Sequence, residues 1–246
     1  MKIIEPSVEI IDDIDGEKIL KKLEICGRTC YQSTPKEDSA AKFIGNIIKS
    51  GHDSVIEHVS VTVRFICSRG CSHQLVRHRL ASFSQESMRF CSYNKDRFGK
   101  EITIIKPQWT NGFTINPIAG GFDVRPTEQK RRDLMSDEII KKQALIHKWI
   151  SQMLDDEETY FYLIEGGAKP EDARGVLPQD TKTTVVMTAN LREWRHVIDM
   201  RCDSHAQAEI RGLCTDLLDQ FYNKIPVAFD DLYEKYIYST TCVKGM

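Results

Sequence analysis

Alternation of apolar and polar residues is clearest in the segment VSVTVRFIC, residues 59–67. Apolar side chains occupy its odd-numbered positions, which predicts a β-strand with one buried face. Shorter or weaker alternation predicts further strands within residues 1–12, 101–106 and 181–189.

Helical spacing of apolar residues is more extensive than alternation. It predicts helices at about 16–31, from 38 or 39 onward, 71–79, 170–177, 191–200, up to about 224, and 228–237, and a long helix or helix pair at about 128–165. Ser204 and Gln207 have the spacing of a capping box, which places Arg201 just before the start of the helix that ends near 224. The pattern as a whole predicts an α+β protein in which long helices flank a small, mostly antiparallel or mixed sheet.

Two segments lack either periodicity. Residues 107–127 contain three Pro, three Gly and two Asn, which favours a loop or an insertion. Residues 238–246 are expected to form a loose tail. A chain of 246 residues suits one large domain, and we expect a single domain over 1–246.

The composition is that of an ordinary globular protein, with 41% hydrophobic and 28% charged residues. The net charge of −2 does not favour a broad nucleic-acid-binding surface. No apolar run of about 18 residues predicts a membrane span, and acidic residues near the N-terminus do not favour a signal peptide. A cytoplasmic protein is therefore expected, with its eight cysteines reduced.

Two features of the sequence could suggest a metal site: a pair of cysteine motifs and a segment with histidines and acids. Cys26/Cys30 and Cys67/Cys71 have i,i+4 spacing, so a zinc site with four thiolates is conceivable, but buried free thiols are favoured. The segment GHDSVIEH, residues 51–58, contains histidines and acids without a recognisable ligand spacing, and a polar loop is favoured there. No metal site is predicted.

The least ordinary segment is RHRLASFSQESMR, residues 77–89. Five arginines and one acid lie between Arg64 and Arg89, whereas a solvated helix face usually mixes both signs. Arginine side chains bind phosphate and carboxylate groups through two hydrogen bonds, and serines add further donors. The segment therefore predicts a site for a small anionic molecule.

The pattern R-H-R-x-x-S-x-x-x-x-S-x-R in this segment resembles the signature of the flavin-dependent thymidylate synthases. Three other segments are similar to that family: GHDSVIEH, ARGVLP at 173–178, and RCDSHAQAE at 201–209. The family often has Asn-Glu where this chain has Ser84-Gln85, and Asn or His at the position of His196. The resemblance covers residues from about 40 to 235.

The resemblance implies a set of site residues. Arg201 would be catalytic, as a fixed cation that stabilises negative charge on a uracil ring. The residues implied to bind dUMP are Gln74, Arg77, Gln85, Glu86, Ser87, Met88, Arg89, Arg174 and Arg201. The residues implied to bind FAD are His52, Ser54, Arg77, His78, Arg79, Gln85, Asn190, Arg192 and His196. Ser87 is interpreted as a hydrogen-bonding ligand and not as a nucleophile, because arginines surround it and no base does.

The same resemblance implies an activity. dUMP would be methylated to dTMP, with carbon from methylenetetrahydrofolate and electrons from NADPH through FAD. The family works as a homotetramer with shared active sites, and no nucleic acid or membrane partner is implied. Two alternatives remain: an anion- or nucleic-acid-binding module that uses Arg77, Arg79 and Arg89, and a zinc-stabilised interaction protein.

Overall fold

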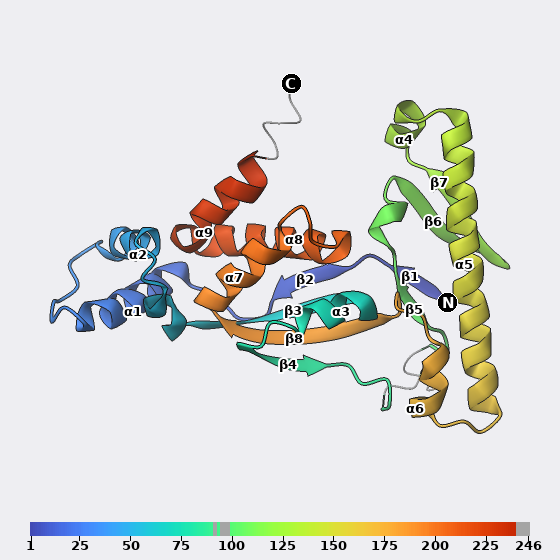
Figure 1. Ribbon diagram of the computed structural model, residues 1–246, viewed down its shortest axis with the longest axis horizontal. Helices are drawn as coiled ribbons and strands as arrows, with labels where there is room; N and C mark the ends of the chain where they lie inside the picture. The colour runs from blue at the N-terminus through green and yellow to red at the C-terminus, as the bar shows by residue number, and fades with distance from the viewer. Residues whose placement is uncertain (91–92, 94–98, 240–246) are drawn as a thin grey trace. The chain divides into compact units, whose positions relative to one another are not determined.

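The computed structural model describes residues 1–90, 93 and 99–239 (Figure 1). Contacts between residues divide the chain into two compact units. The first unit comprises Met1–Pro6, Cys67–Gly70 and Glu86–Thr183. The second unit comprises Ser7–Ile66, Cys71–Gln85 and Thr184–Met246.

The strands of the second unit belong to a four-stranded sheet with the order β2-β3-β8-β4. These strands are β2 (Ser7–Ile10), β3 (Ser60–Ser68), β4 (Ala81–Gln85) and β8 (Lys182–Asn190). β2 runs antiparallel to β3 with Val8 opposite Phe65, and β4 runs antiparallel to β8 with Ser82 opposite Thr188. The strands predicted around residues 59–67 and 181–189 are confirmed, and so is the α+β class.

Strand β4 was not expected from the sequence pattern. Its sequence is ASFSQ, in which the two serines are exposed and Ala81, Phe83 and Gln85 are half-buried. Only one of the three half-buried residues is large and apolar, so the sequence shows no strongly apolar face. The strand forms at the edge of the sheet, where backbone pairing with β8 stabilises it. Its position fixes the end of the RHR segment, because Arg79 lies two residues before the strand begins.

The helical elements of the second unit follow the predicted order, except that a 3-10 helix forms at Asp53–His58, where a polar loop was favoured. They are α1 (Gly16–Thr29), α2 (Ala40–Lys49), the 3-10 helix η1 (Asp53–His58), α7 (Leu191–Arg201), α8 (Ala208–Lys224), α9 (Pro226–Tyr233) and the π-helical turn η5 (Glu234–Tyr238). A further helix, α3 (Arg69–Leu75), follows β3 directly. In Figure 1, α7 continues directly from β8, and α8 and α9 lie beside it.

A row of aromatic side chains connects the sheet to these helices. The ring of Phe65 on β3 lies 6.3 Å from that of Trp194 on α7, and Trp194 lies 5.8 Å from Phe221 on α8. Phe221 stacks on Phe229 of α9 at 4.6 Å. The Trp194 indole also donates a 2.9 Å hydrogen bond to the backbone carbonyl of Val61. All four rings are fully buried, so α7 is held firmly against β3.

The first unit contains two small sheets and a long helix. β1 (Lys2–Ile4) pairs in parallel with β5 (Thr103–Ile105), and β6 (Phe113–Ile118) pairs with β7 (Gly121–Pro126) as a hairpin. Its helical elements are η3 (Gln108–Thr110), α4 (Glu128–Asp133), α5 (Ser136–Glu165), α6 (Pro170–Ala173) and η4 (Arg174–Val176). Apolar side chains of α5, including Ile146, Ile150 and Met153, pack against these strands.

The long helix or helix pair expected at about 128–165 is a pair, α4 and α5, with a break between Asp133 and Ser136. Two other sequence-based expectations were wrong in detail. Residues 107–127 form η3 and the β6–β7 hairpin and not a loop, because their glycines serve the turn, where Gly120 has a φ of 81°. Ser204 does not cap α8, since Gln207 is the N-cap and its side chain accepts from the Ile210 amide.

The cysteines in the described part of the chain are free thiols. Cys67 and Cys71 are buried, but Cys30 is exposed, which departs from the expectation of buried thiols. Cys91 and Cys242 lie outside the described residues, as does most of the tail expected at 238–246. Within the described ranges, no helix combines the length and apolar content that a membrane crossing needs.

Candidate active site

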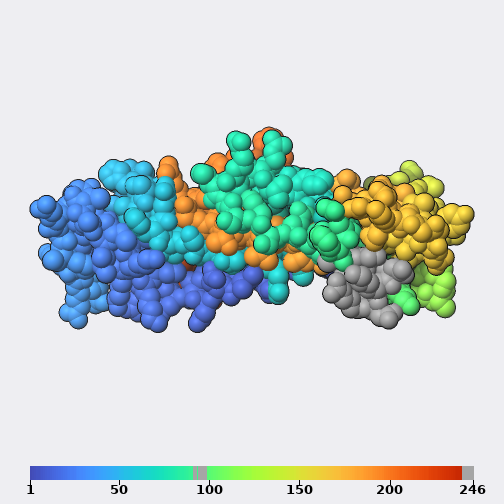
Figure 2. All heavy atoms as spheres, turned by 90° about the horizontal axis from the view of Figure 1, so that it is seen from below, coloured from blue at the N-terminus to red at the C-terminus, as the bar shows by residue number. Residues whose placement is uncertain are grey.

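A basic pocket lies at the point where α3 leads towards β4. It has a volume of about 630 Å³ and is lined by His73, Gln74, Arg77, Arg79 and Arg201. We call it the arginine pocket. Arg77 and Arg79 are exposed, and the teal-green segment that carries them forms part of the surface in Figure 2. Its lining contains three guanidinium groups and no carboxylate, which suits an anion.

Local structure explains how these side chains converge. α3 ends at Leu75, earlier than the predicted residue 79, and the amide of His78 donates to the Leu75 carbonyl at 3.1 Å in the turn that follows. This turn leaves Arg77 and Arg79 exposed and buries His78 between them. Gln74 and Arg77 reach the same pocket, as their spacing predicted. Arg79 lines it too, although it was expected at the flavin.

Arg201 is fixed in this pocket by two hydrogen bonds. Its Nε donates to Nε2 of His78 at 2.9 Å, and its Nη2 donates to the backbone carbonyl of Gln74 at 3.2 Å. Arg201 is the last residue of α7 and does not precede the start of α8 directly, as the sequence had suggested. Because α7 is anchored on the sheet through Trp194, the Arg201 guanidinium has a defined position.

Burial determines the protonation state of His78. The side chain is only 5% exposed, and burial, the Arg201 cation and His196 together lower its pKa from 6.5 to about 4. His78 is therefore neutral near pH 7, and its Nε2 is free to accept the hydrogen bond from Arg201. Beside Arg201, burial raises the pKa of the Cys202 thiol to about 11, so that this cysteine is not a thiolate.

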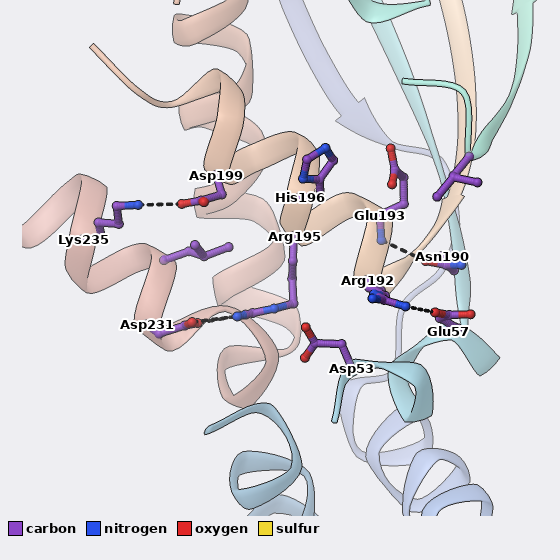
Figure 3. Close-up of a pocket in the computed structure, with 12 residues that line it drawn as sticks. Asp53, Glu57, Asn190, Arg192, Glu193, Arg195, His196, Asp199, Asp231 and Lys235 are labelled. Carbon is purple, nitrogen blue, oxygen red and sulfur yellow. Dashed lines mark hydrogen bonds and ion pairs between the residues drawn. The ribbon is translucent and has the colours of Figure 1, made fainter. Parts of the chain in front are cut away.

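A second, larger pocket of about 1110 Å³ lies along α7, and we call it the α7 pocket (Figure 3). Its lining residues come from η1, the segment just before β4, the end of β8, α7, α9 and η5. They are Asp53, Glu57, Leu80, Asn190, Arg192, Glu193, Arg195, His196, Asp199, Asp231, Leu232 and Lys235. Asn190 is the N-cap of α7, where its side chain accepts from the Glu193 amide at 2.9 Å.

Opposite charges are paired around the α7 pocket. The Arg195 guanidinium contacts both carboxylate oxygens of Asp231, at 2.8 and 2.6 Å. Lys235 binds Asp199 at 2.8 Å, and Arg192 binds Glu57 at 2.5 Å. The Asp199 pKa is lowered, because hydrogen bonds from Lys235 and Tyr236 outweigh the opposing effect of burial. The pocket therefore offers polar groups of both signs and not a single basic surface.

His78 contacts residues of both pockets. Its ring lies 6.0 Å from that of His196, which lines the α7 pocket, while its Nε2 contacts Arg201 in the arginine pocket. The carboxylate of Glu193 lies 3.8 Å from Nδ1 of His78. The buried His78 imidazole thus lies between a residue of the α7 pocket and a residue of the arginine pocket.

Five of the remaining predicted residues belong to the first unit: Glu86, Ser87, Met88, Arg89 and Arg174. Arg89 Nε donates to a carboxylate oxygen of Glu171 at 2.8 Å, and Arg174 Nε donates to the backbone carbonyl of Glu171 at 3.1 Å. Glu86 pairs with Lys182 at 2.6 Å. Ser87 and Met88 are half-buried between these positions.

The structure thus brings together some predicted residues and not others. Gln74, Arg77 and Arg201 share the arginine pocket, and Asn190, Arg192 and His196 share the α7 pocket. His52 and Ser54 are exposed next to Asp53 but do not line the pocket. Gln85 lies on β4 and donates to the Ser72 hydroxyl at 2.9 Å.

Sequence reasoning missed several residues that line these pockets: His73, Asp53, Glu57, Glu193, Arg195, Asp199, Asp231 and Lys235. Those on α7 could have been found from helical spacing. Glu193 and His196, and likewise Arg192 and Arg195, are three residues apart and so share a face. The residues of α9 and η5 gave no such signal, because only packing brings them to α7.

Comparison with known proteins decides the family. The family model described as thymidylate synthase complementing protein matches residues 10–227. The chain is 33% identical over 231 residues to a flavin-dependent thymidylate synthase of Mycobacterium avium, covering 92% of this chain and 84% of that protein. A protein of the same name from Mycobacterium tuberculosis H37Rv is 32% identical over the same length.

The chain belongs to the flavin-dependent thymidylate synthase family. The resemblance seen in the sequence is confirmed by the length of these matches. Among solved structures, the chain is similar to the UMP/dUMP methylase PolB from Streptomyces cacaoi bound with 5-Br dUMP. The TM-score is 0.69 at 20% identity, covering 94% of this chain and 96% of that one, and shows that the fold is shared.

The residues of the α7 pocket suit the flavin dinucleotide that the family name implies. Asn190 and His196 offer hydrogen-bonding groups, and Arg192 and Arg195 offer cations for a pyrophosphate. Both cations are paired with acids on the pocket wall, so an incoming anion would exchange with Glu57 or Asp231. The donor set therefore fits such a group in this family member.

Proposed function

We propose that this chain catalyses the reductive methylation of dUMP to dTMP, with methylenetetrahydrofolate as the carbon donor and NADPH-reduced FAD as the hydride source. Membership of the family supports the reaction type. The observation that carries the proposal is the arginine pocket, in which Arg201 is immobilised among other basic side chains without a lining acid.

The chemistry explains why a fixed cation is needed. Uracil C5 is a poor nucleophile until negative charge builds on the ring. A guanidinium held beside the ring oxygen and nitrogen stabilises that charge, and it does so best when it need not reorganise during the reaction. Arg201 is held by His78 and by the Gln74 carbonyl, so its orientation is set before substrate binds.

The phosphate and sugar of dUMP are assigned to the other polar residues. We assign Gln74 and Arg77 to the nucleotide in the arginine pocket. We further assign Gln85, Glu86, Ser87, Met88, Arg89 and Arg174 to the same ligand. Arg89 and Arg174 both contact Glu171, so these two guanidinium groups lie near one position where an anion can bind.

The cofactor is assigned to the α7 pocket and the adjoining residues: His52, Ser54, Arg77, His78, Arg79, Gln85, Asn190, Arg192 and His196. FAD would supply the hydride, and the protein would orient it. His78 is neutral and buried, so it contributes shape and hydrogen bonding without an added charge.

A homotetramer with shared active sites forms part of the proposal. Large apolar side chains on α5 are exposed, among them Ile140, Leu145 and Tyr162. Exposed apolar side chains of this kind suit packing against another copy of the chain. Sedimentation that shows a monomer at micromolar concentration would contradict this assembly.

The proposal is tested by reconstitution. Purified protein with added FAD should show flavin absorption bands that shift when dUMP is added, and it should form dTMP when folate and NADPH are supplied. Arg201→Lys keeps one positive charge but loses the guanidinium hydrogen bonds, and should lower the rate about 100-fold or more. A protein that takes up neither FAD nor dUMP, but binds DNA with a steep dependence on salt, would favour the nucleic-acid-binding alternative.

A further inference from the structure

Two residues of α7 are connected through His78. Glu193 lies in the first turn of the helix and Arg201 at its last residue, so they are about 12 Å apart along the axis. The side chains of both residues reach towards His78, which lies outside the helix. Its Nδ1 lies 3.8 Å from a Glu193 carboxylate oxygen, and its Nε2 accepts from Arg201 Nε at 2.9 Å. The three side chains form one row that runs from the α7 pocket to the arginine pocket.

The tautomer of His78 is fixed by its hydrogen bond from Arg201. An arginine Nε–H can only donate, so Nε2 of His78 must carry a lone pair and no proton. His78 is neutral near pH 7, and its single ring proton is therefore on Nδ1. That nitrogen is the one beside Glu193, whose side chain is only 8% exposed. The buried carboxylate thus lies next to the one proton whose position determines whether His78 can accept from Arg201.

We infer that Glu193 is a positioning residue for Arg201 and acts through His78. Its carboxylate favours the tautomer of His78 with a proton on Nδ1, which keeps the Nε2 lone pair directed at the arginine. Without the carboxylate, His78 loses its preference for this arrangement, and the guanidinium is held less firmly. This inference deepens the proposed function and rests on it, because the role of Arg201 at the uracil ring belongs to that proposal.

A consequence is that the two pockets are coupled. Glu193 lines the α7 pocket, whereas Arg201 lines the arginine pocket. A molecule that contacts the Glu193 carboxylate alters the acceptor available to His78 and hence the restraint on Arg201. Occupation of the cofactor pocket would in this way change the affinity of the nucleotide pocket, and the reverse effect must be equal in size.

These side chains could also suggest a metal site. Ligand atoms of His78, Glu193 and His196 lie within 4.8 Å of one another. The Arg201 cation argues against it, because its guanidinium already contacts the His78 ring and would repel a bound cation. The positioning role needs no group beyond the side chains present.

The test compares variants of Glu193 by their binding of dUMP, measured by calorimetry. Glu193→Leu removes the carboxylate that lies 3.8 Å from Nδ1 of His78 and should weaken dUMP binding about tenfold. Glu193→Gln keeps an acceptor oxygen and should have a smaller effect. Glu37→Gln removes an exposed carboxylate that lines neither pocket, and should leave the dissociation constant within about twofold.

A double-mutant cycle separates positioning from a general structural role. In an Arg201→Lys background, Glu193→Leu should have no further effect on dUMP binding if it acts through Arg201. Additive effects would overturn the inference. Should Glu193→Leu fail to fold, Glu193→Gln takes its place in the cycle. Ring nitrogen NMR of the wild-type protein should show the His78 proton on Nδ1, and a proton on Nε2 would also overturn it.

Two outcomes distinguish this inference from the proposed function. If the wild-type protein binds no dUMP, the proposed function fails. If it binds dUMP normally and the Glu193 variants match it, only the positioning role fails. Binding of Zn²⁺ at micromolar concentration that is lost in Glu193→Gln would assign the three side chains to a metal, and would overturn the inference as well.

Discussion

Arg201 donates a 2.9 Å hydrogen bond to Nε2 of His78, and this contact requires an uncharged imidazole. A protonated His78 would present a second donor and a second positive charge to the guanidinium. Burial and the adjacent cation lower the His78 pKa to about 4, which keeps the ring neutral over the physiological range. The state of one buried histidine therefore determines whether the arginine is held in place.

This contact predicts a dependence of stability on pH. The His78 pKa in the folded protein lies below its ordinary value of 6.5, so between these values the unfolded chain binds the proton and the folded protein does not. The contribution of neutral His78 to the free energy of unfolding is fully present above pH 6.5 and is lost as the pH falls towards 4. From pH 7.5 to pH 5, His78 should contribute a loss of about 2 kcal/mol in the free energy of unfolding.

Urea unfolding at these two pH values measures the loss. His78→Gln keeps a polar side chain that cannot titrate, and serves as the comparison. The variant should lose about 2 kcal/mol less than the wild type over the same interval. Equal losses in both proteins would show that other groups account for the acid sensitivity.

The ion pair between Glu171 and Arg89 is expected to lower the affinity for dUMP. Its carboxylate pairs with Arg89, which we assign to the dUMP phosphate, so the substrate must displace it. Glu171→Gln removes this competing charge but keeps the backbone carbonyl that binds Arg174. Since exposed ion pairs contribute up to about 1 kcal/mol, the dissociation constant of dUMP should fall by up to about fivefold.

Asp172→Asn is the matched control for this variant. It removes an equal charge from the next position of α6, on an exposed side chain. Calorimetric titration should show tighter dUMP binding in Glu171→Gln than in Asp172→Asn. The same affinity in both variants would mean that net charge, and not release of Arg89, determines binding.

Ser87 is expected to bind and not to react. Its hydroxyl accepts from the Arg89 amide at 3.3 Å, a contact that orders the turn around the arginine. Ser87→Ala should therefore reduce the rate of dTMP formation by no more than about tenfold, the effect of losing one hydrogen bond. Complete loss of the reaction with normal dUMP binding would instead point to a nucleophilic serine.

The strands and helices with a strong apolar pattern were predictable. The alternation at 59–67 gave β3, and the apolar spacing before Pro226 gave α8. Strand β4 was not predictable, because its stability comes from pairing with β8 and not from its own side chains. The hairpin at 113–126 was hidden for a similar reason, since its prolines and glycines resemble those of a loop.

The site was predictable where a short motif carries the chemistry. Arg77, Gln74 and Arg201 converge as expected, because a single turn and one helix end place them. The walls of the α7 pocket were not predictable from local sequence. Asp231 and Lys235 reach that pocket only because α9 packs on α8 through the Phe221–Phe229 stack, and α8 packs on α7 through Phe221 and Trp194.

The attachment of α9 to α7 leads to a final prediction. Arg195 is only 14% exposed and contacts both oxygens of Asp231 as well as the Ala228 carbonyl. Arg195→Ala leaves these acceptors without their donor, and should lower the free energy of unfolding by about 1–3 kcal/mol. The Lys235–Asp199 pair has both side chains half-exposed, so Lys235→Ala should cost under about 1 kcal/mol.

Denaturant unfolding of the two variants measures this difference directly. Each substitution removes one cation and one ion pair between α7 and the C-terminal elements, so their charge effects match. Arg195→Ala should also bind FAD less tightly, because α9 forms one wall of the α7 pocket. If both variants lose the same stability, burial of the Arg195 guanidinium contributes nothing, and α9 is held by its aromatic packing alone.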